Sequence, residues 1–260
     1  MAKRKTDQPL LPLILSVKAA NWRMNDQDQD HADREFQKIR EKALQRDGYR
    51  CRFCNFFSRK FQEVHHKDDD HHNNTLENLV TACFMCHSVQ HIGLSGHMKE
   101  SVLIWLPEIS QAALNHLIRS CIVARFTCTE TPLSPPGTPP NRKIAPYADG
   151  GEILSAAESV MAALQDRSAE AAKLIGTSDP KELGSILQDI AIQRPDIYET
   201  RGEILNGIRL MNLGKKMSND KDVLVEHVRA WIDPKTNGPY SSGLKADSWS
   251  EIMRDVLGIS

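Results

Sequence analysis

The chain has 260 residues, of which 40% are hydrophobic and 26% charged, and its formal net charge is −1. This composition is typical of a folded globular protein, and the length favours two small domains over one large domain. The near-zero net charge gives no general indication of a nucleic-acid or membrane partner. No apolar run reaches the ~20 residues that a membrane-spanning helix requires, so we expect no membrane insertion of its own.

The first 128 residues predict a mixture of strands, loops and helices. The apolar stretch 9–17 predicts a buried strand within residues 10–24, and it lacks the cleavage site of a signal peptide. Apolar residues then recur at helical spacing over 34–47, where Asp47-Gly48 indicates the helix end. The other expected elements are a strand at 61–66, a polar loop at 67–75, a helix from His87, a strand at 103–106 and a helix at 107–124 that begins near Ser110 or Glu108.

Six of the chain's 13 prolines lie between residues 129 and 151. Such density disfavours both helix and central strand, so this stretch predicts an extended, proline-rich linker. Beyond it we expect a mostly helical domain, in which Asp179 caps a helix that begins with Pro180. The predicted helices span residues 152–175, 180–193, 195–212, 221–232 and 248–257, and Trp231 and Trp249 are expected core residues. The interpretation is therefore an α+β chain with a domain at 1–128, a linker at 129–151 and a helical domain at 152–260.

Four cysteines form two Cys-x-x-Cys pairs, Cys51/Cys54 and Cys83/Cys86. Two such pairs can complete the tetrahedral shell of a structural Zn²⁺ ion. The alternatives are two disulfides or four unrelated thiols, but without a signal peptide we expect the reducing cytoplasm, which favours a metal. Removal of this zinc should unfold the surrounding module, because metal binding also supplies its folding energy. Cys121, which lies in an apolar helical run, is expected to be a buried thiol.

His65, His66, Asn78 and His87 lie between or directly after these cysteines. The pattern resembles the HNH (ββα-metal) nuclease family. The resemblance implies that His66 is the general base, that Asn78 orients its imidazole, and that His65 and His87 bind a catalytic divalent ion such as Mg²⁺, Mn²⁺, Ni²⁺ or Zn²⁺. His91, one helical turn after His87, is a further candidate ligand.

Two features bear on whether such a centre acts on DNA. Asp68, Asp69 and Asp70 make the loop between His66 and Asn78 acidic, a departure from what a DNA-cutting enzyme would favour. A retained scaffold without turnover therefore stands beside a working centre. Basic residues that could hold a phosphate backbone nearby are Arg46, Arg50, Arg52, Arg59 and Lys60.

A second and narrower resemblance covers residues 10–125 and 176–180. It rests on Asn21-Trp22-Arg23, Leu44-Gln45-Arg46-Asp47, Cys51-Arg52-Phe53-Cys54, Phe61-Gln62-Glu63, Asn73-Asn74, Asn78-Leu79-Val80-Thr81-Ala82-Cys83, Leu106-Pro107-Glu108-Ile109 and Gly176-Thr177-Ser178-Asp179-Pro180. These strings are similar to the DotN (IcmJ) family, accessory components of type IVB secretion and plasmid conjugation machinery. The family keeps the zinc cysteines and often loses the nuclease histidines, which are present here.

This resemblance implies a cytoplasmic protein that binds the coupling-protein ATPase and reaches the inner membrane only through that partner. Three functions follow as hypotheses. The first is a zinc-binding accessory component of the secretion apparatus. The second is an active metal-dependent endonuclease that leaves 5′-phosphate ends, and the third is a zinc-dependent DNA-binding module without chemistry.

Overall fold

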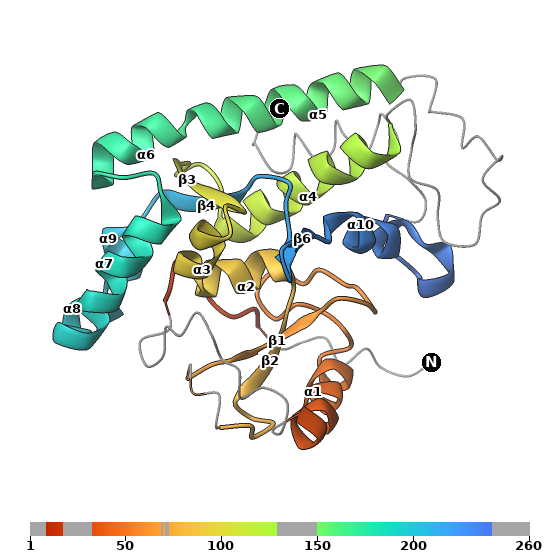
Figure 1. Cartoon of the computed structure of the whole chain (residues 1–260), viewed down its shortest axis with the longest axis horizontal. Coiled ribbons are helices and arrows are strands. Elements are labelled where there is room, and N and C mark those ends of the chain that lie inside the picture. The colour runs from red at the N-terminus through yellow and green to blue at the C-terminus, as the bar shows by residue number, and fades with distance from the viewer. Residues whose placement is uncertain (1–8, 18–32, 69, 71–72, 129–149, 241–260) are drawn as a thin grey trace.

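The computed structural model describes residues 9–17, 33–68, 70, 73–128 and 150–240 (Figure 1). Helices and short antiparallel sheets are mixed along the chain, which confirms the α+β class. Each of the three sheets in the described residues has two strands, in the pairs β1-β2, β3-β4 and β5-β6. No helix in these ranges combines the length and the apolar character needed to cross a membrane.

From α1 onward, the expected elements of the N-terminal part are found with small shifts of their boundaries, and β2 and the separate helix α3 are present in addition to them. Its elements are α1 (Asp33–Arg46), β1 (Glu63–His66), β2 (Leu79–Ala82), α2 (Phe84–Gln90), α3 (Ile92–His97), β3 (Ser101–Trp105) and α4 (Gln111–Thr127). The helix expected from His87 begins earlier, at Phe84. The predicted cap of α4 is confirmed, because the Ser110 hydroxyl accepts a hydrogen bond from the Ala113 amide at 3.1 Å.

The strand expected within residues 10–24 is wrong for its described part, residues 9–17; residues 18–24 lie outside the described ranges. Residues 9–17 form no ladder with a single neighbouring strand. Leu11 donates its amide to the Arg52 carbonyl, whereas Ser16 donates to the Val89 carbonyl and accepts from Ile92. The predicted burial is found, since Leu15 and Val17 are buried. Apolar content alone thus predicted where this segment lies but not its hydrogen-bond partners.

In the C-terminal part, helices are interrupted by strands. The elements are α5 (Gly150–Asp166), α6 (Ser168–Ile175), α7 (Pro180–Gln193), α8 (Pro195–Glu199), α9 (Arg201–Ile204), β4 (Ile208–Asn212), β5 (Met217–Ser218), β6 (Lys221–Asp222), α10 (Leu224–Ile232) and a short 3-10 helix (Pro234–Thr236). The boundaries of α7 are as predicted, and Asp179 accepts from the Lys181 amide at 2.8 Å as its cap. The predicted helix at 248–257 and most of the linker lie outside the described residues.

Three helix predictions in this part need correction. The helix expected at 152–175 is divided at Arg167 into α5 and α6. Residues 195–212 form two short helices and then β4, because Gly207 adopts a left-handed backbone, with φ +85°, between them and the strand. Residues 221–232 begin as β6 and become helical only at Leu224. Sequence periodicity missed both strands, since β4 exists only through its pairing with β3.

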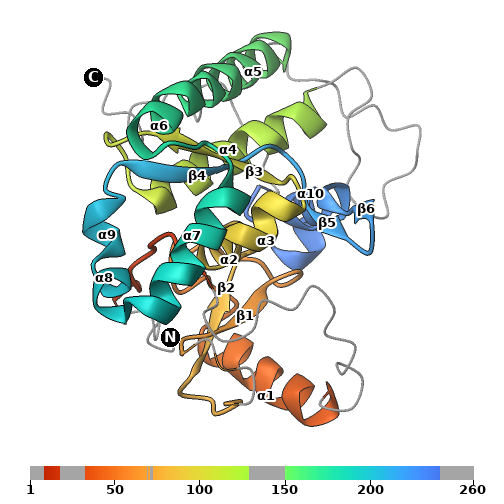
Figure 2. The same cartoon turned by 60° about the vertical axis from the view of Figure 1, so that its left-hand side comes forward.

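The pairing of β3 with β4 connects residues far apart in the sequence. Their register places Leu103 opposite Leu210, and the β3 residues contact α5, α6 and α7 as well as α3 (Figure 2). Figure 1 shows α5 and α6 along one edge of the molecule and the β1-β2 hairpin with α1 at the opposite edge. One buried apolar cluster contains residues of both the N-terminal and the C-terminal parts, including Phe56, Leu114 and Trp231.

Candidate metal centres

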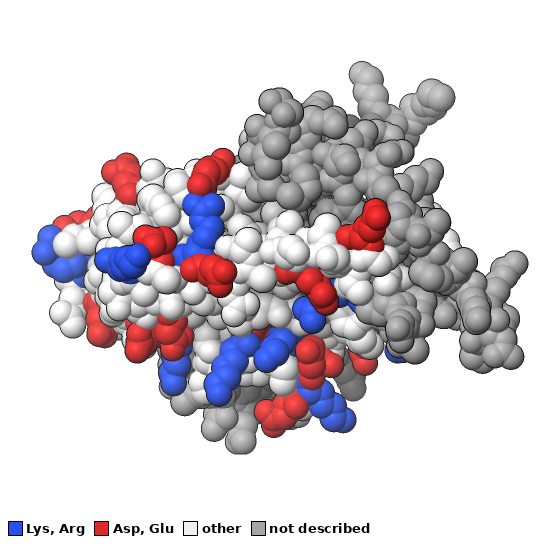
Figure 3. Space-filling view, turned by 90° about the horizontal axis from the view of Figure 1, so that it is seen from above, with Lys and Arg blue, Asp and Glu red and all other residues white. Residues whose placement is uncertain are grey.

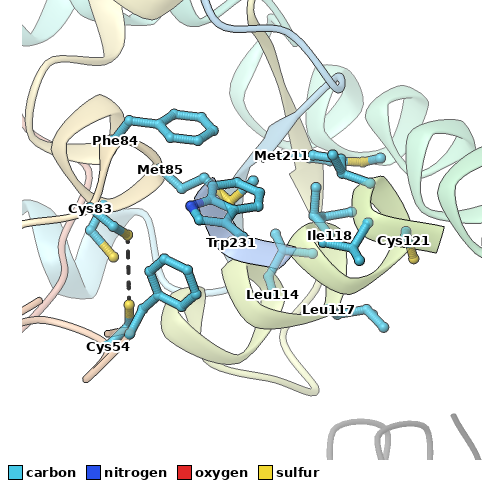
Figure 4. Close-up of a cluster of buried hydrophobic side chains, with 14 of the residues drawn as sticks. Cys54, Cys83, Phe84, Met85, Leu114, Leu117, Ile118, Cys121, Met211 and Trp231 are labelled. Carbon is cyan, nitrogen blue, oxygen red and sulfur yellow. Dashed lines mark hydrogen bonds between the residues drawn. The ribbon is translucent and has the colours of Figure 1, made fainter. Parts of the chain in front are cut away.

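The four cysteines of the two Cys-x-x-Cys pairs meet in the interior of the protein. All four are free and buried, and their sulfur atoms lie within 4.8 Å of one another. The Sγ atoms of Cys54 and Cys83 are 3.7 Å apart (Figure 4). A disulfide would require ~2.05 Å, whereas two thiolates on a tetrahedral Zn²⁺ with bonds of ~2.3 Å lie about 3.8 Å apart. The donor set and its spacing therefore fit a closed, structural zinc site.

The first cysteine pair is shaped by a tight turn. Asn55 adopts a left-handed backbone with φ +60° and donates its amide to the Cys51 carbonyl at 2.8 Å. Cys51 in turn donates its amide to the Phe56 carbonyl at 2.9 Å. Asparagine tolerates this conformation better than most residues, which explains its place directly after Cys54. The turn brings both sulfur atoms to the same side of the chain.

The second pair is presented by α2. Cys83 is the residue before the helix and Cys86 lies in its first turn, so that one helical turn separates their side chains. The His87 amide donates to the Cys83 carbonyl at 2.9 Å, which fixes this turn. The buried neighbours Phe84 and Met85 point away from the cysteines into the apolar cluster shown in Figure 4.

The protonation preferences of the buried thiols conflict. Hydrogen bonds from Cys51 and then from Cys83 and Cys86 lower the pKa of Cys54 well below its usual range. Burial raises the pKa of both Cys83 and Cys86 well above theirs. A divalent cation would resolve this conflict, because it binds all four sulfurs as thiolates. Cys121 stands apart as predicted: it is buried, and burial raises its pKa to about 12.

Helix α4 supplies polar partners to the cysteine cluster that sequence analysis missed. Asn115 Nδ2 lies 3.3 Å from Cys86 Sγ, and Arg119 Nη2 lies 3.2 Å from Cys83 Sγ. His116 Nε2 forms a hydrogen bond of 2.7 Å with the carbonyl of Cys54. The available signal was the set of polar residues at positions 115, 116 and 119, which lie between apolar residues of this helix.

A second group of metal-ligating side chains lies on β1 and α2. His65 and His87, both predicted ligands, come together with His91, and their ligand nitrogens lie within 4.8 Å of one another. His87 Nδ1 is 2.5 Å from Glu63 Oε2, which leaves Nε2 of His87 as its ligand atom. Three histidines with a carboxylate behind one of them are donors suited to a divalent transition metal.

Glu63 joins this histidine cluster to the C-terminal part. Lys216 Nζ lies 3.3 Å from Glu63 Oε1. Burial acts to raise the pKa of Glu63, but its interactions with His87 and Lys216 outweigh burial and hold that pKa well below its usual range. For Lys216, burial acts to lower the pKa, and Glu63 and Glu100 reverse the effect and raise it. Both groups are therefore charged at neutral pH, and Lys216 lines a pocket together with His87 and His91. No sequence signal had indicated Lys216.

The predicted base His66 lies apart from this cluster. Adjacent strand residues point to opposite faces, so His65 and His66 leave β1 in opposite directions. His66 Nε2 is 2.9 Å from Asn74 Oδ1, and its ring stacks on Phe36 at a centroid distance of 5.8 Å. Asn74 therefore supplies a hydrogen bond to His66.

Asn78, which was predicted to orient the His66 imidazole, forms hydrogen bonds within the acidic loop. Its amide nitrogen donates to Asp68 Oδ1 at 2.7 Å and to the Asn73 carbonyl at 2.9 Å. Its amide oxygen accepts from the Asp68 backbone amide at 3.2 Å. Asp69 of this loop lies outside the described residues.

Three of the basic residues considered as phosphate-binding residues instead form hydrogen bonds with backbone carbonyls of this chain. Arg46 donates to the Leu76 and Leu79 carbonyls. Arg50 and Arg52 donate to backbone carbonyls at positions 55 and 9, respectively. Figure 3 shows acidic and basic side chains interspersed on the face that it displays. These contacts weigh against a dedicated DNA-binding module.

Comparison with known proteins identifies the family. No family model matches the chain. The type 4 apparatus protein DotN of Legionella pneumophila is 30% identical to it over 210 residues, which are 79% of this chain and 85% of that protein. This identity extends over most of both proteins, and the chain therefore belongs to the DotN family.

Proposed function

We propose that this protein is a zinc-binding accessory component of a type IV secretion apparatus and associates there with the coupling-protein ATPase. The observation that supports the proposal is its identity with a type 4 apparatus protein over most of both chains. The four-cysteine cluster supports the zinc part of the proposal. In this role the protein works on the cytoplasmic side and reaches the inner membrane only through its partner. We propose more specifically that this apparatus is a type IVB secretion or conjugation system.

The apolar side chains that remain exposed suggest where a partner binds. The apolar residues of α4 are internal, since Leu114, Leu117 and Ile118 are buried. Large exposed side chains occur instead on α3, α6, α7 and α9: Leu94, Leu174, Ile186, Ile192 and Ile204. Figures 1 and 2 both show α7, α8 and α9 grouped at one end of the molecule. We propose this end as the contact with the ATPase, because exposed apolar groups mark interaction sites.

Affinity purification of the tagged protein from cells that carry the secretion system tests this proposal. The ATPase should be recovered with the wild type and lost with the double substitution Ile186→Glu/Ile192→Glu. Lys42→Glu, at an exposed position on α1, changes the net charge by the same amount; it is the matched control and should retain the partner. Failure to recover the ATPase with the wild type would refute the association, and recovery with the double variant would refute only the proposed surface.

A second candidate function, a metal-dependent endonuclease of the HNH type, is favoured by the convergence of His65, His87 and His91. A divalent ion held there would neutralise a phosphate group and stabilise the leaving oxygen. Glu63 would orient His87 toward the ion. The HNH resemblance implies that His66 is the base that accepts a proton from water. The position of His66 on the opposite face of β1 from the cluster weighs against this candidate.

Incubation of plasmid DNA with the purified protein and Mg²⁺, Mn²⁺ or Ni²⁺ tests the second candidate. His66→Ala and His87→Ala should abolish cleavage, whereas His97→Ala, at an exposed position beyond the cluster, should not. Equal behaviour of the wild type and His66→Ala would exclude catalysis through His66. Intact DNA with the wild type would leave the histidine cluster without a nuclease role.

A further inference from the structure

Arg119 is a charged side chain in the centre of the protein. It lies on α4 and is fully buried, with 0% of its surface exposed. Its guanidinium carbon lies 3.7 Å from the centre of the Phe56 ring and 5.7 Å from that of Trp231. Within the described residues no carboxylate forms an ion pair with it, and its Nε atom has no hydrogen-bond partner. An isolated guanidinium in such a place is costly, because it cannot lose its proton.

The groups that can compensate this charge are the cysteine sulfurs. Nη2 of Arg119 lies 3.2 Å from Cys83 Sγ, while Nη1 lies 3.3 Å from Nδ1 of His116. Four thiolates around one divalent cation carry a net charge of −2. A cation in contact with that cluster offsets half of this charge, and the cluster in turn is the counter-ion of the arginine.

We propose that Arg119 is a positioning residue of the four-cysteine zinc centre, which sets the metal affinity by charge compensation and by its hydrogen bond to the Cys83 thiolate. The inference rests on the zinc occupancy proposed above and extends it to α4. Asn115 Nδ2 makes a corresponding but uncharged hydrogen bond to Cys86 Sγ at 3.3 Å. Charged hydrogen bonds are stronger than neutral ones, so the arginine should contribute more than the asparagine.

The arrangement also connects the metal centre with the rest of the fold. Arg119 packs against Phe56, which follows the first cysteine pair, and lies near Trp231 of α10. Phe56 and Trp231 contact each other edge to face at 5.6 Å. If Arg119 only filled space, an apolar residue of similar length would suit these aromatic neighbours equally well. A role in charge compensation predicts that lysine at position 119 preserves the zinc affinity better than methionine does.

The test compares Arg119→Lys, which keeps the charge, with Arg119→Met, which keeps the approximate length alone. Arg125→Met, at an exposed position on the same helix, is the control. Zinc content of the wild type is measured first, and absence of zinc would overturn both this inference and the zinc proposal. Zinc affinity is then measured by competition with a chromophoric chelator. Arg119→Met should bind zinc about 10- to 100-fold more weakly, as is typical of lost partners of metal ligands.

Arg119→Lys should show a smaller loss, and Arg125→Met should match the wild type. Equal affinity of the wild type and Arg119→Met, or tighter binding by methionine than by lysine, would overturn the inference while leaving the zinc proposal intact. The cobalt-substituted protein provides a measurement that does not depend on the methionine variant folding. Its sulfur-to-cobalt charge-transfer band should shift to lower energy in Arg119→Lys, because the thiolate loses a geometrically matched donor. An unchanged band would contradict the hydrogen bond.

Discussion

Removal of the zinc should unfold the first cysteine pair and disturb the apolar cluster beside it. The perturbation is Cys54→Ser, which replaces one buried sulfur ligand. Ordering residues 48–58 costs roughly 16 kcal/mol at about 1.5 kcal/mol per residue. Burial of Phe53 and Phe56, at roughly 200 Å² each, contributes about 10 kcal/mol. The shortfall of about 6 kcal/mol corresponds to about half of the ~10–16 kcal/mol that a structural zinc supplies, as expected if two pairs share one ion.

The assay follows Trp231, which contacts Phe56 at 5.6 Å and Phe84 at 6.0 Å between ring centres. Cys54→Ser should lose its zinc, shift its tryptophan emission to longer wavelength and become sensitive to proteases near residues 48–58. Addition of a strong chelator to the wild type should have the same effect. Cys121→Ala is the matched control, since it also removes a buried thiol but lies outside the four-cysteine cluster.

The control should be destabilised without loss of metal. Retention of native emission and protease resistance by Cys54→Ser, with its zinc gone, would show that apolar packing alone maintains this segment. Loss of zinc from Cys121→Ala would show that the metal depends on general stability and not on the four ligands.

Three further predictions concern packing, pH and thiol reactivity. Gly184→Ala should destabilise the protein by ~1–3 kcal/mol in chemical denaturation, because a Cβ there would lie 2.6 Å from Gly93 Cα between α7 and α3; Ser185→Ala, exposed on the same helix, should be nearly neutral. Burial lowers the pKa of His227 from 6.5 to about 4, so the unfolded chain binds the proton more tightly. This contribution to the free energy of unfolding is complete above pH 6.5, and ~3 kcal/mol of it is lost as the pH falls toward 4. The free energy of unfolding of His227→Phe should therefore decrease less than that of the wild type over the same pH range. Cys121, with a pKa of about 12, should react with iodoacetamide only after unfolding, and reaction in the native protein would contradict its burial.

Features that depend on local spacing could be predicted from the amino-acid sequence. The Cys-x-x-Cys pairs indicated one four-sulfur cluster, and the capping residues Ser110 and Asp179 marked helix starts that the structure confirms. These signals are local because a cap or a tight metal-binding turn involves residues only a few positions apart. The resemblance to the DotN family is likewise supported by the comparison.

Contacts between distant segments could not be predicted in this way, because they form only in the folded protein. Strand β4 forms because its residues pair with β3, and Lys216 reaches Glu63 because the chain returns to the histidine cluster after that strand. Arg119 meets Cys83 across 36 positions, although its helix had predicted only an apolar face. Local propensity carries no information about such partners, since their stabilisation arises only when burial brings the segments together.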